Sequence, residues 1–357
     1  MQEPSDEKLA PVSEDEPGTE PGDSYEGEYA DEAALEEVEA VEEAVAPVGP
    51  VKEPEPPRVR RLDLVSRRNI FFFISLLIIV PGIISMSTKH FLLGIDFAGG
   101  TETTISVRQG VTVADVQRAV DAENVEGSVI PAGNGYIIRT PVLSQDRQNQ
   151  MQADLNKSLG AKVESVLEVC GTIAGETVEF ALLAVVLASV AILLLLAIRF
   201  RNVPGGWRAG FQFGGSALAA LLHDVFVLTG LFSIFGTVLH WQVGEINAFF
   251  VTAVLTVVGF SVHDTIVVFD RIRENLRVSQ RLSFEQVVNL SIMQTAARSI
   301  ITSFTVVLVL AAIFISGGPT LQGLALALLI GIVSGTYSSI FNAAPLLVVW
   351  RRLQPLR

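Results

Sequence analysis

Six long apolar runs constrain the fold of this chain more than any other feature of its sequence. They cover residues 70–86, 178–198, 209–235, 246–269, 300–316 and 321–349. A helix that crosses a bilayer needs about 20 mainly apolar residues, with a lower limit of about 17. Half of all residues are hydrophobic and only 18% are charged, which is typical of an integral membrane protein. We therefore predict that each run crosses a membrane once.

The first 57 residues carry the negative charge of the chain. They hold 19 acidic residues and two lysines and contribute −17, whereas the other 300 residues contribute +4. The segment is rich in Glu, Pro, Gly and Ala and has few large apolar residues, so burial cannot offset the entropy lost on ordering. We predict a disordered acidic tail in the cytoplasm, which is either simply solvated or binds a partner. It is not a secretory signal, because the first apolar run begins only near Ile70.

Arginines mark the connectors that we expect to face the cytoplasm, as the positive-inside rule requires. The connectors 236–245 and 317–320 contain no Lys or Arg. Arginines gather before the first run and after the second, fourth and sixth: Arg58, Arg60, Arg61, Arg67, Arg68; Arg199, Arg201, Arg208; Arg271, Arg273, Arg277, Arg281; Arg351, Arg352 and Arg357. This pattern predicts six spans with both termini in the cytoplasm and the first run as an uncleaved signal anchor.

Residues 89–175 have the composition of a soluble domain. We expect strands at 102–107 and 162–169, a hairpin over 125–140 that turns at residues 133–135, and helices at 113–122 and 144–159. The order β-α-β-β-α-β is that of a small ferredoxin-like α+β domain. We place this domain outside the cytoplasm. The remaining predicted segments are 58–88 for the basic flank and first span, 176–352 for spans two to six, and 353–357 for the cytoplasmic C-terminus.

Ionisable groups lie inside three of the predicted spans. His223-Asp224 lies in the third, His263-Asp264 in the fourth, and Arg298 at the start of the fifth. A charged group within a bilayer costs at least about 2.5 kcal/mol and marks a candidate functional site. A buried carboxylate near an arginine can take up and release a proton as its surroundings move. We predict a proton relay at Asp264 and, on weaker grounds, at Asp224, with static hydrogen bonding to neighbouring helices as the alternative.

Small residues are abundant in the third and sixth spans, and we interpret them as helix-packing positions. They are Gly214, Gly215, Ser216, Ala219, Ala220, Gly331, Ser334 and Gly335.

Several function classes are excluded or disfavoured by the sequence. The single cysteine, Cys170, excludes an internal disulfide framework and a cysteine metal site. No Gly-Lys dipeptide occurs, so there is no phosphate loop of the Walker A type. An intramembrane serine protease is disfavoured because Ser261 and His263 are two residues apart on one helix and point to different faces. We expect no enzyme activity, no metal and no organic cofactor.

Four short motifs resemble the SecF family, the smaller membrane subunits of the SecD–SecF accessory complex of the bacterial Sec translocon. Residues 259–275 follow the family pattern of Gly, an aromatic residue, Ser, a segment that ends in Asn-Asp, Thr, an apolar run and Asp-Arg-Ile-Arg-Glu-Asn. Residues 94–100 are similar to Gly-Ile-Asp-Phe-x-Gly-Gly, and residues 169–176 and 222–225 match the approaches to the second and third spans. The resemblance covers about residues 60–352. Its motif residues are Gly94, Asp96, Gly99, Gly100, Asp270, Arg271, Arg273 and Asn275.

The resemblance implies a fold, partners and an energy source. Such subunits pair with SecD to form a twelve-helix unit of the resistance-nodulation-division type, and they associate with the SecYEG channel, with YajC as a further candidate partner. The unit assists late export of preproteins and draws on the proton motive force, so protons are the coupling ion. The implied setting is the bacterial cytoplasmic membrane with its lipid, and no nucleic acid is involved. Asp264 corresponds to the proton-handling aspartate, and Arg298 to the arginine that answers it.

Two departures and two alternatives accompany this interpretation. His263 replaces the usual Asn beside the key carboxylate, where it either shares the proton or supplies an equivalent hydrogen bond. Ala98 replaces a common Thr, and the acidic tail has no counterpart in the family pattern. One alternative is a small-molecule exporter of the same superfamily, for which residues 89–175 are too few to supply a ligand domain. The other is a membrane scaffold that transports nothing, in which the His-Asp pairs only hold helices together.

Overall fold

The computed structural model describes residues 63–132, 135–279 and 281–355. The predicted tail 1–57 and the arginines up to residue 61 lie outside these ranges, as do two of the three residues at the predicted hairpin turn. Among the described residues, six helical segments are long and apolar enough to cross a membrane, which confirms the predicted number of spans. The fold class is confirmed as well, because a small four-stranded α+β domain follows the first of these segments.

The membrane helices largely coincide with the apolar runs. They are α2 (Arg68–Lys89), α6 (Gly171–Arg199), α7 (Gly206–Ser233), α8 (Ala248–Val278), α9 (Phe284–Ser316) and α10 (Pro319–Ser338) with α11 (Ala344–Leu353). Short π-helical turns extend α7 at Ile234–Val238 and join α10 to α11 at Ser339–Ala343. The helix α9 starts 16 residues before the predicted run, because Ser283 and Gln286 form a capping box that begins it among polar residues. Arg298 therefore lies in the middle of α9, not at its start.

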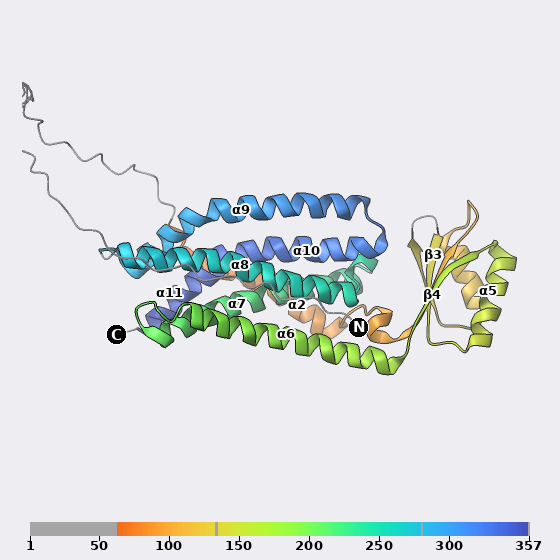
Figure 1. The fold of residues 1–357 in the computed structure, drawn as a ribbon. Coiled ribbons are helices and arrows are strands. Elements are labelled where there is room, and N and C mark those ends of the chain that lie inside the picture. Colours follow the sequence, from red (N-terminus) through yellow and green to blue (C-terminus); the bar gives the residue numbers. More distant parts are fainter. Residues whose placement is uncertain (1–62, 133–134, 280, 356–357) are drawn as a thin grey trace, which may run out of the picture. The chain divides into compact units, whose positions relative to one another are not determined.

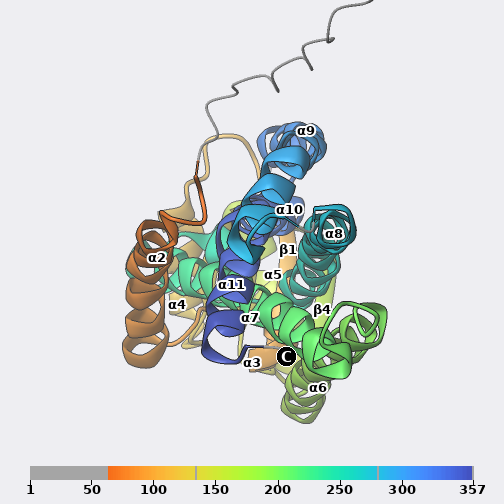
Figure 2. The same cartoon turned by 90° about the vertical axis from the view of Figure 1, so that its left-hand side faces the viewer.

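Two helices form the centre of the bundle. The helix α7 packs against both α2 and α6, and α10 packs against α7, α8 and α9 (Figure 2). Where α2 crosses α7, Gly82 and Gly230 face each other, and a Cβ added at Gly82 would lie 2.8 Å from the Cα of Gly230. Glycine at both positions lets the two backbones approach closely.

The sheet domain (Gly100–Val169) has the predicted β-α-β-β-α-β order. Its elements are β1 (Gly100–Ser106), α4 (Val113–Ala122), β2 (Ser128–Ala132), β3 (Gly135–Thr140), α5 (Gln145–Leu159) and β4 (Lys162–Val169). The strands form an antiparallel sheet in the order β2-β3-β1-β4. The helix α4, predicted over the same residues, is capped by Thr112, whose hydroxyl accepts from the Asp115 amide.

One face of the sheet is covered by α4 and α5. Ile105 and Ile138 on this face pack with Val116, Val120 and Met151 in a single apolar core. Residues of the opposite face, among them Glu102 and Arg139, line a cavity together with residues from the connector between α7 and α8. This domain follows α2 and precedes α6 (Figure 1).

The Gly-Gly pair of the 94–100 motif turns the chain into the sheet domain. A one-turn helix that the sequence did not predict, α3 (Ile95–Ala98), precedes Gly99 and Gly100. These glycines have φ of 72° and 133°, values that favour glycine. A Cβ on Gly100 would lie 2.7 Å from the carbonyl oxygen of Thr140, so the pair also lets β1 start close to the end of β3.

Candidate functional site: two buried carboxyl clusters

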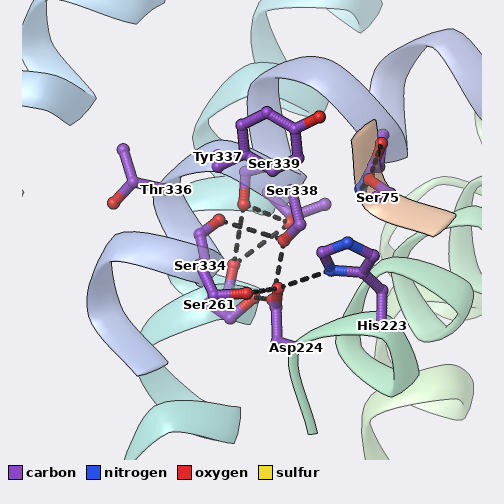
Figure 3. A network of polar contacts seen from close by, with 12 residues as sticks. Ser75, His223, Asp224, Ser261, Ser334, Thr336, Tyr337, Ser338 and Ser339 are labelled. Atoms are coloured by element: carbon purple, nitrogen blue, oxygen red, sulfur yellow. Dashed lines mark hydrogen bonds and ion pairs between the residues drawn. The ribbon is translucent and has the colours of Figure 1, made fainter. Parts of the chain in front are cut away.

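Asp224 is the centre of the larger polar cluster within the bundle. It projects from α7, is 1% exposed and accepts hydrogen bonds from three serines. Ser261 of α8 and Ser338 of α10 donate to Oδ2 at 2.7 and 2.6 Å, and Ser334 of α10 donates to Oδ1 at 2.7 Å (Figure 3). The carboxyl thereby joins three helices. We call these residues, with His223, the Asp224 cluster.

His223 completes the Asp224 cluster from the same helix. Its Nδ1 lies 3.1 Å from Oδ1 of Asp224, and its ring stacks on Tyr337 with centroids 6.2 Å apart. The Nε2 atom is buried and has no hydrogen-bond partner within the described part of the chain. If Nδ1–H of a neutral ring donates to Asp224, Nε2 is an acceptor.

Asp264 lies in a second, sparser cluster between α8, α9 and α10. It is 3% exposed, and its one hydrogen bond to another described residue comes from Thr336 at 3.4 Å, the long end of the range. Thr336 also contacts Ser303 at 2.5 Å. Ser299 is buried beside the carboxyl without a hydrogen bond of its own. We call Asp264, Ser299, Ser303 and Thr336 the Asp264 cluster.

The helix α10 separates the two clusters. Ser334 and Ser338 are four residues apart and point toward Asp224, whereas Thr336 lies between them in sequence and points away from Asp224 (Figure 3). The helix α8 also contributes to both clusters, through Ser261 and Asp264. A rotation or shift of α10 against α8 would therefore change the surroundings of both carboxyls at once.

The predicted pairing of Asp264 with Arg298 is not present in this structure. Arg298 is exposed, and no ion pair connects it to a described residue. The cause is helix geometry. Ser299 and Ser303 face the interior of the bundle, so Arg298, one residue earlier, faces outward.

His263 is likewise exposed and makes no hydrogen bond to a described residue, although Asp264 beside it is buried. The structure thus separates Asp264 from Arg298, whereas His263 remains within electrostatic range of the carboxyl without a hydrogen bond to it.

The remaining motif residues connect elements at the two ends of α8. At one end, Asp270 pairs with Arg199 at 3.0 Å and with Arg273 at 3.3 Å, and Arg271 and Asn275 both donate to Gln294 of α9. At the other end, the amide of Gly94 donates to the carbonyl of Ile246, and Asp96 accepts from the amide of Ala248. These residues hold α8 against its neighbours, and none of them belongs to the Asp224 cluster or the Asp264 cluster.

Sequence reasoning missed the hydroxyl groups that surround both carboxyls. Ser334 was interpreted as a packing residue, but it donates to Asp224. The available signal was spacing: serines at 334 and 338, and at 299 and 303, are four apart and lie on one helix face beside a buried charge.

Comparison with known proteins places these features in a family. The family model for the C-terminal part of the protein export membrane proteins SecD/SecF matches residues 149–353, and the model of the SecD/SecF GG motif matches residues 84–111. The chain belongs to the SecD/SecF family. Protein translocase subunit SecF of Thermobaculum terrenum is 42% identical over 83% of this chain and 96% of its own length. SecF of Haemophilus influenzae is 33% identical over 79% of this chain and 83% of its own length.

Solved structures of SecDF share the fold. The crystal structure of the translocon-associated SecDF of Thermus thermophilus has a TM-score of 0.72 and 31% identity over 82% of this chain. SecDF in its super-membrane-facing form has a TM-score of 0.59 and 29% identity. The chain spans 39% of the length of each. Family membership and the six spans together make this chain a multi-pass membrane protein of Sec-dependent protein export.

Proposed function

We propose that this chain is the SecF-type subunit of a complex with SecD that uses the proton motive force to assist preprotein translocation. It works beside the SecYEG channel, with YajC as a further candidate partner, in the bacterial cytoplasmic membrane with both termini in the cytoplasm. It catalyses no reaction, and protons are its coupling ion. The observation that carries the proposal is Asp264, a buried carboxyl with one long hydrogen bond in the centre of a membrane bundle.

The proposed proton site consists of Asp264, Arg298, His263, Asp224 and His223, of which Asp264 takes the proton and Asp224 anchors the surrounding helices. Asp264 carries the proton, because few donors compensate a charge there and a proton removes the need for them. Arg298 directly precedes Ser299 on α9, and successive residues of an α-helix are about 100° apart around its axis. A rotation of α9 by that angle would therefore replace the hydroxyl of Ser299 opposite Asp264 with the guanidinium of Arg298. The protonated carboxyl suits the hydroxyl face and the ionised carboxyl suits Arg298. A proton can then select between two helix positions, as a two-state coupling requires.

The deciding experiment is Asp264→Asn in the complex with SecD, reconstituted with the Sec channel and its ATPase. We expect normal insertion and assembly, normal export without a proton gradient, and no further stimulation when a gradient is applied. Asp154→Asn, at a half-exposed carboxyl on α5, is the control that should keep full stimulation. Full stimulation of Asp264→Asn by the gradient would contradict the relay.

The same experiment separates the alternatives. A scaffold without transport predicts no gradient-dependent component in the wild-type complex. A small-molecule exporter predicts that the wild type is recovered without the Sec channel and moves solutes in the absence of a preprotein. The cavity beside the sheet domain, a candidate ligand site for an exporter, measures about 410 Å³. The charged residues Arg139, Glu102 and Glu245 that line it are already paired with one another.

A further inference from the structure

A partly buried arginine connects the sheet domain to the start of α8. Arg139 of β3 donates to Glu102 of β1 at 2.8 Å, and it also pairs with Glu245, three residues before α8. The side chains of Arg139 and Glu245 are 20% and 8% exposed. Of these two contacts of Arg139, the one with Glu102 lies within the sheet domain. The one with Glu245 joins the sheet domain to the connector before α8. Buried charge pairs of this kind fix geometry even where they add little net stability.

Main-chain contacts next to Glu245 complete the connection. The amide of Gly94 donates to the carbonyl of Ile246 at 2.9 Å, and the amide of Ile246 donates to the carbonyl of Leu92 at 2.8 Å. The carboxylate of Asp96 accepts from the amide of Ala248, the first residue of α8, at 2.9 Å. A Cβ on Gly94 would lie 2.9 Å from the Cβ of Asn247 and closer still to the Glu245 carboxylate, so the approach favours glycine. We call these contacts, with the Arg139–Glu245 pair, the α8 joint.

None of the buried apolar clusters of the described residues spans the joint. Two cavities of about 410 and 490 Å³ lie beside it, and Arg139, Ile95 and Gln242 line both. Besides its chain connections to α3 and α6, the sheet domain is therefore held near α8 by a few polar contacts that border open cavities. Such a contact can open and close without the repacking of a close-packed core.

The joint lies on the same helix as the proposed proton site. Asp264 is 16 residues beyond Ala248 on the unbroken helix α8, a distance of about 24 Å at 1.5 Å per residue. A helix transmits a shift or rotation along its axis as one body, so a displacement of α8 at Asp264 moves the residues that Arg139 and Asp96 hold.

We propose that Arg139 is a positioning residue that transmits movement of α8 to the sheet domain through Glu245. It touches neither Asp264 nor any residue of the two clusters, and it acts by keeping the sheet domain attached to the start of α8. The inference rests on the proposed function for its role in export, but the joint itself can be tested without any proton gradient.

The test compares Arg139→Gln with Glu102→Gln in the full chain, purified with SecD in lipid nanodiscs. Hydrogen exchange is followed by mass spectrometry on peptides that cover residues 90–99 and 243–250. Arg139→Gln leaves Glu245 buried without its cation, so we expect exchange at the joint amides to rise roughly 10–100-fold, the loss expected for a charge-assisted hydrogen bond. Glu102→Gln removes a charge beside the same arginine within the domain, and we expect less than a threefold change. Unchanged exchange in Arg139→Gln, or an equal rise in both variants, would overturn the joint.

Two further measurements test the transmission. Export in reconstituted vesicles is measured with and without a proton gradient, and Arg139→Gln should lose the gradient-dependent part and keep the rest. Arg139→Lys retains a cation at this position and should restore at least half of the loss. A variant with a loosened joint and full gradient stimulation would overturn the positioning role while leaving the proposed proton site intact. Loss of stimulation by Asp264→Asn tests that site separately, so failure of one proposal does not imply failure of the other.

Discussion

The two buried aspartates differ in how well their charges are compensated. Asp224 accepts from three serines and lies against His223, so four contacts fill its two oxygens. Asp264 has one hydrogen bond of 3.4 Å from the described residues. A carboxylate with several close donors is held firmly in place, whereas one with few close donors leaves much of its charge uncompensated. The residues therefore suit different tasks, Asp224 as a fixed anchor of three helices and Asp264 as the group that changes state.

This contrast predicts a difference in stability between matched variants. Asp224→Asn weakens bonds that connect α7 to α8 and α10, and hydrogen bonds to a charged group contribute about 1.5–3 kcal/mol each. We expect a clear fall in the apparent Tm of the detergent-solubilised complex. Asp264→Asn should leave the Tm close to that of the wild type, since it alters one long bond. The measurement is intrinsic-fluorescence thermal unfolding of both variants, and an equal fall in both would contradict the division of tasks.

Glu245 and Arg139 show how a shared partner decides which group changes with pH. Burial raises the pKa of Glu245. Arg139 lowers this pKa, but repulsion from Glu102 cancels part of that effect. Burial acts on Arg139 as well, but two carboxylates favour its charge, so its pKa stays raised. Because Glu102 and Glu245 share one guanidinium, the charge of Glu245 is only partly compensated and its pKa stays raised.

The sign of the resulting pH dependence can be worked out. A carboxyl whose pKa is higher in the folded than in the unfolded protein stabilises the fold below its unfolded pKa, and that contribution is lost as pH rises through the folded pKa. Glu245→Gln stays neutral at every pH and keeps an oxygen for Arg139. We expect the apparent Tm of this variant to equal or exceed that of the wild type at pH 8. The difference in Tm should shrink as the pH falls below the ordinary pKa of a glutamate. A wild type that is more stable than Glu245→Gln at pH 8 would show that the ion pair outweighs burial.

At the scale of elements, the close crossing of α2 and α7 depends on two glycines. A Cβ at either Gly82 or Gly230 would lie 2.8 Å from the opposite Cα, a contact that only backbone movement can relieve. We expect Gly230→Val to separate the helices and to cost about 1–3 kcal/mol, as overpacking does. Gly175→Ala on α6 meets no atom within 4 Å and is the matched control. Crosslinking between cysteines placed on α2 and α7 should fall in the first variant and stay unchanged in the second.

The elements themselves were largely predictable, because each follows from a local pattern. Apolar runs located the membrane helices, and helical spacing located α4. The start of α9 was missed because its first turns are polar and pack on other helices, so hydropathy alone could not find them. The π-helical turn at Ser339–Ala343 and the short α3 depend on tertiary contacts, which a single sequence does not display.

The site was less predictable than the elements for a physical reason. Both aspartates are recognisable in the sequence because each is a charge within an apolar run, but the sequence does not show which face of α9 turns inward. One residue of helical phase separates Ser299, which is buried, from Arg298, which is exposed. Contacts between distant segments, such as Arg139 with Glu245, leave no local signal at all.

At the scale of the whole molecule, the helices place connectors at two opposite ends of the bundle. The sheet domain and the residues between α7 and α8 share one end, as the bonds of Gly94, Asp96 and Arg139 to the segment 245–248 require. The Asp270–Arg199 pair lies at the far end of α8. Six crossings with arginine-rich connectors at that far end predict that it faces the cytoplasm.

Reporter fusions in cells test this orientation directly. A reporter active only in the cytoplasm, fused after Arg277, should be active, because this position follows four crossings and lies among arginines. The same reporter fused after Gly318 should be inactive, because α9 has then carried the chain back across the membrane. A periplasmic reporter should give the opposite pair of results and controls for expression. Equal activity at both positions would mean that α9 does not cross, and the sheet domain and the proposed proton site would then need a different arrangement in the membrane.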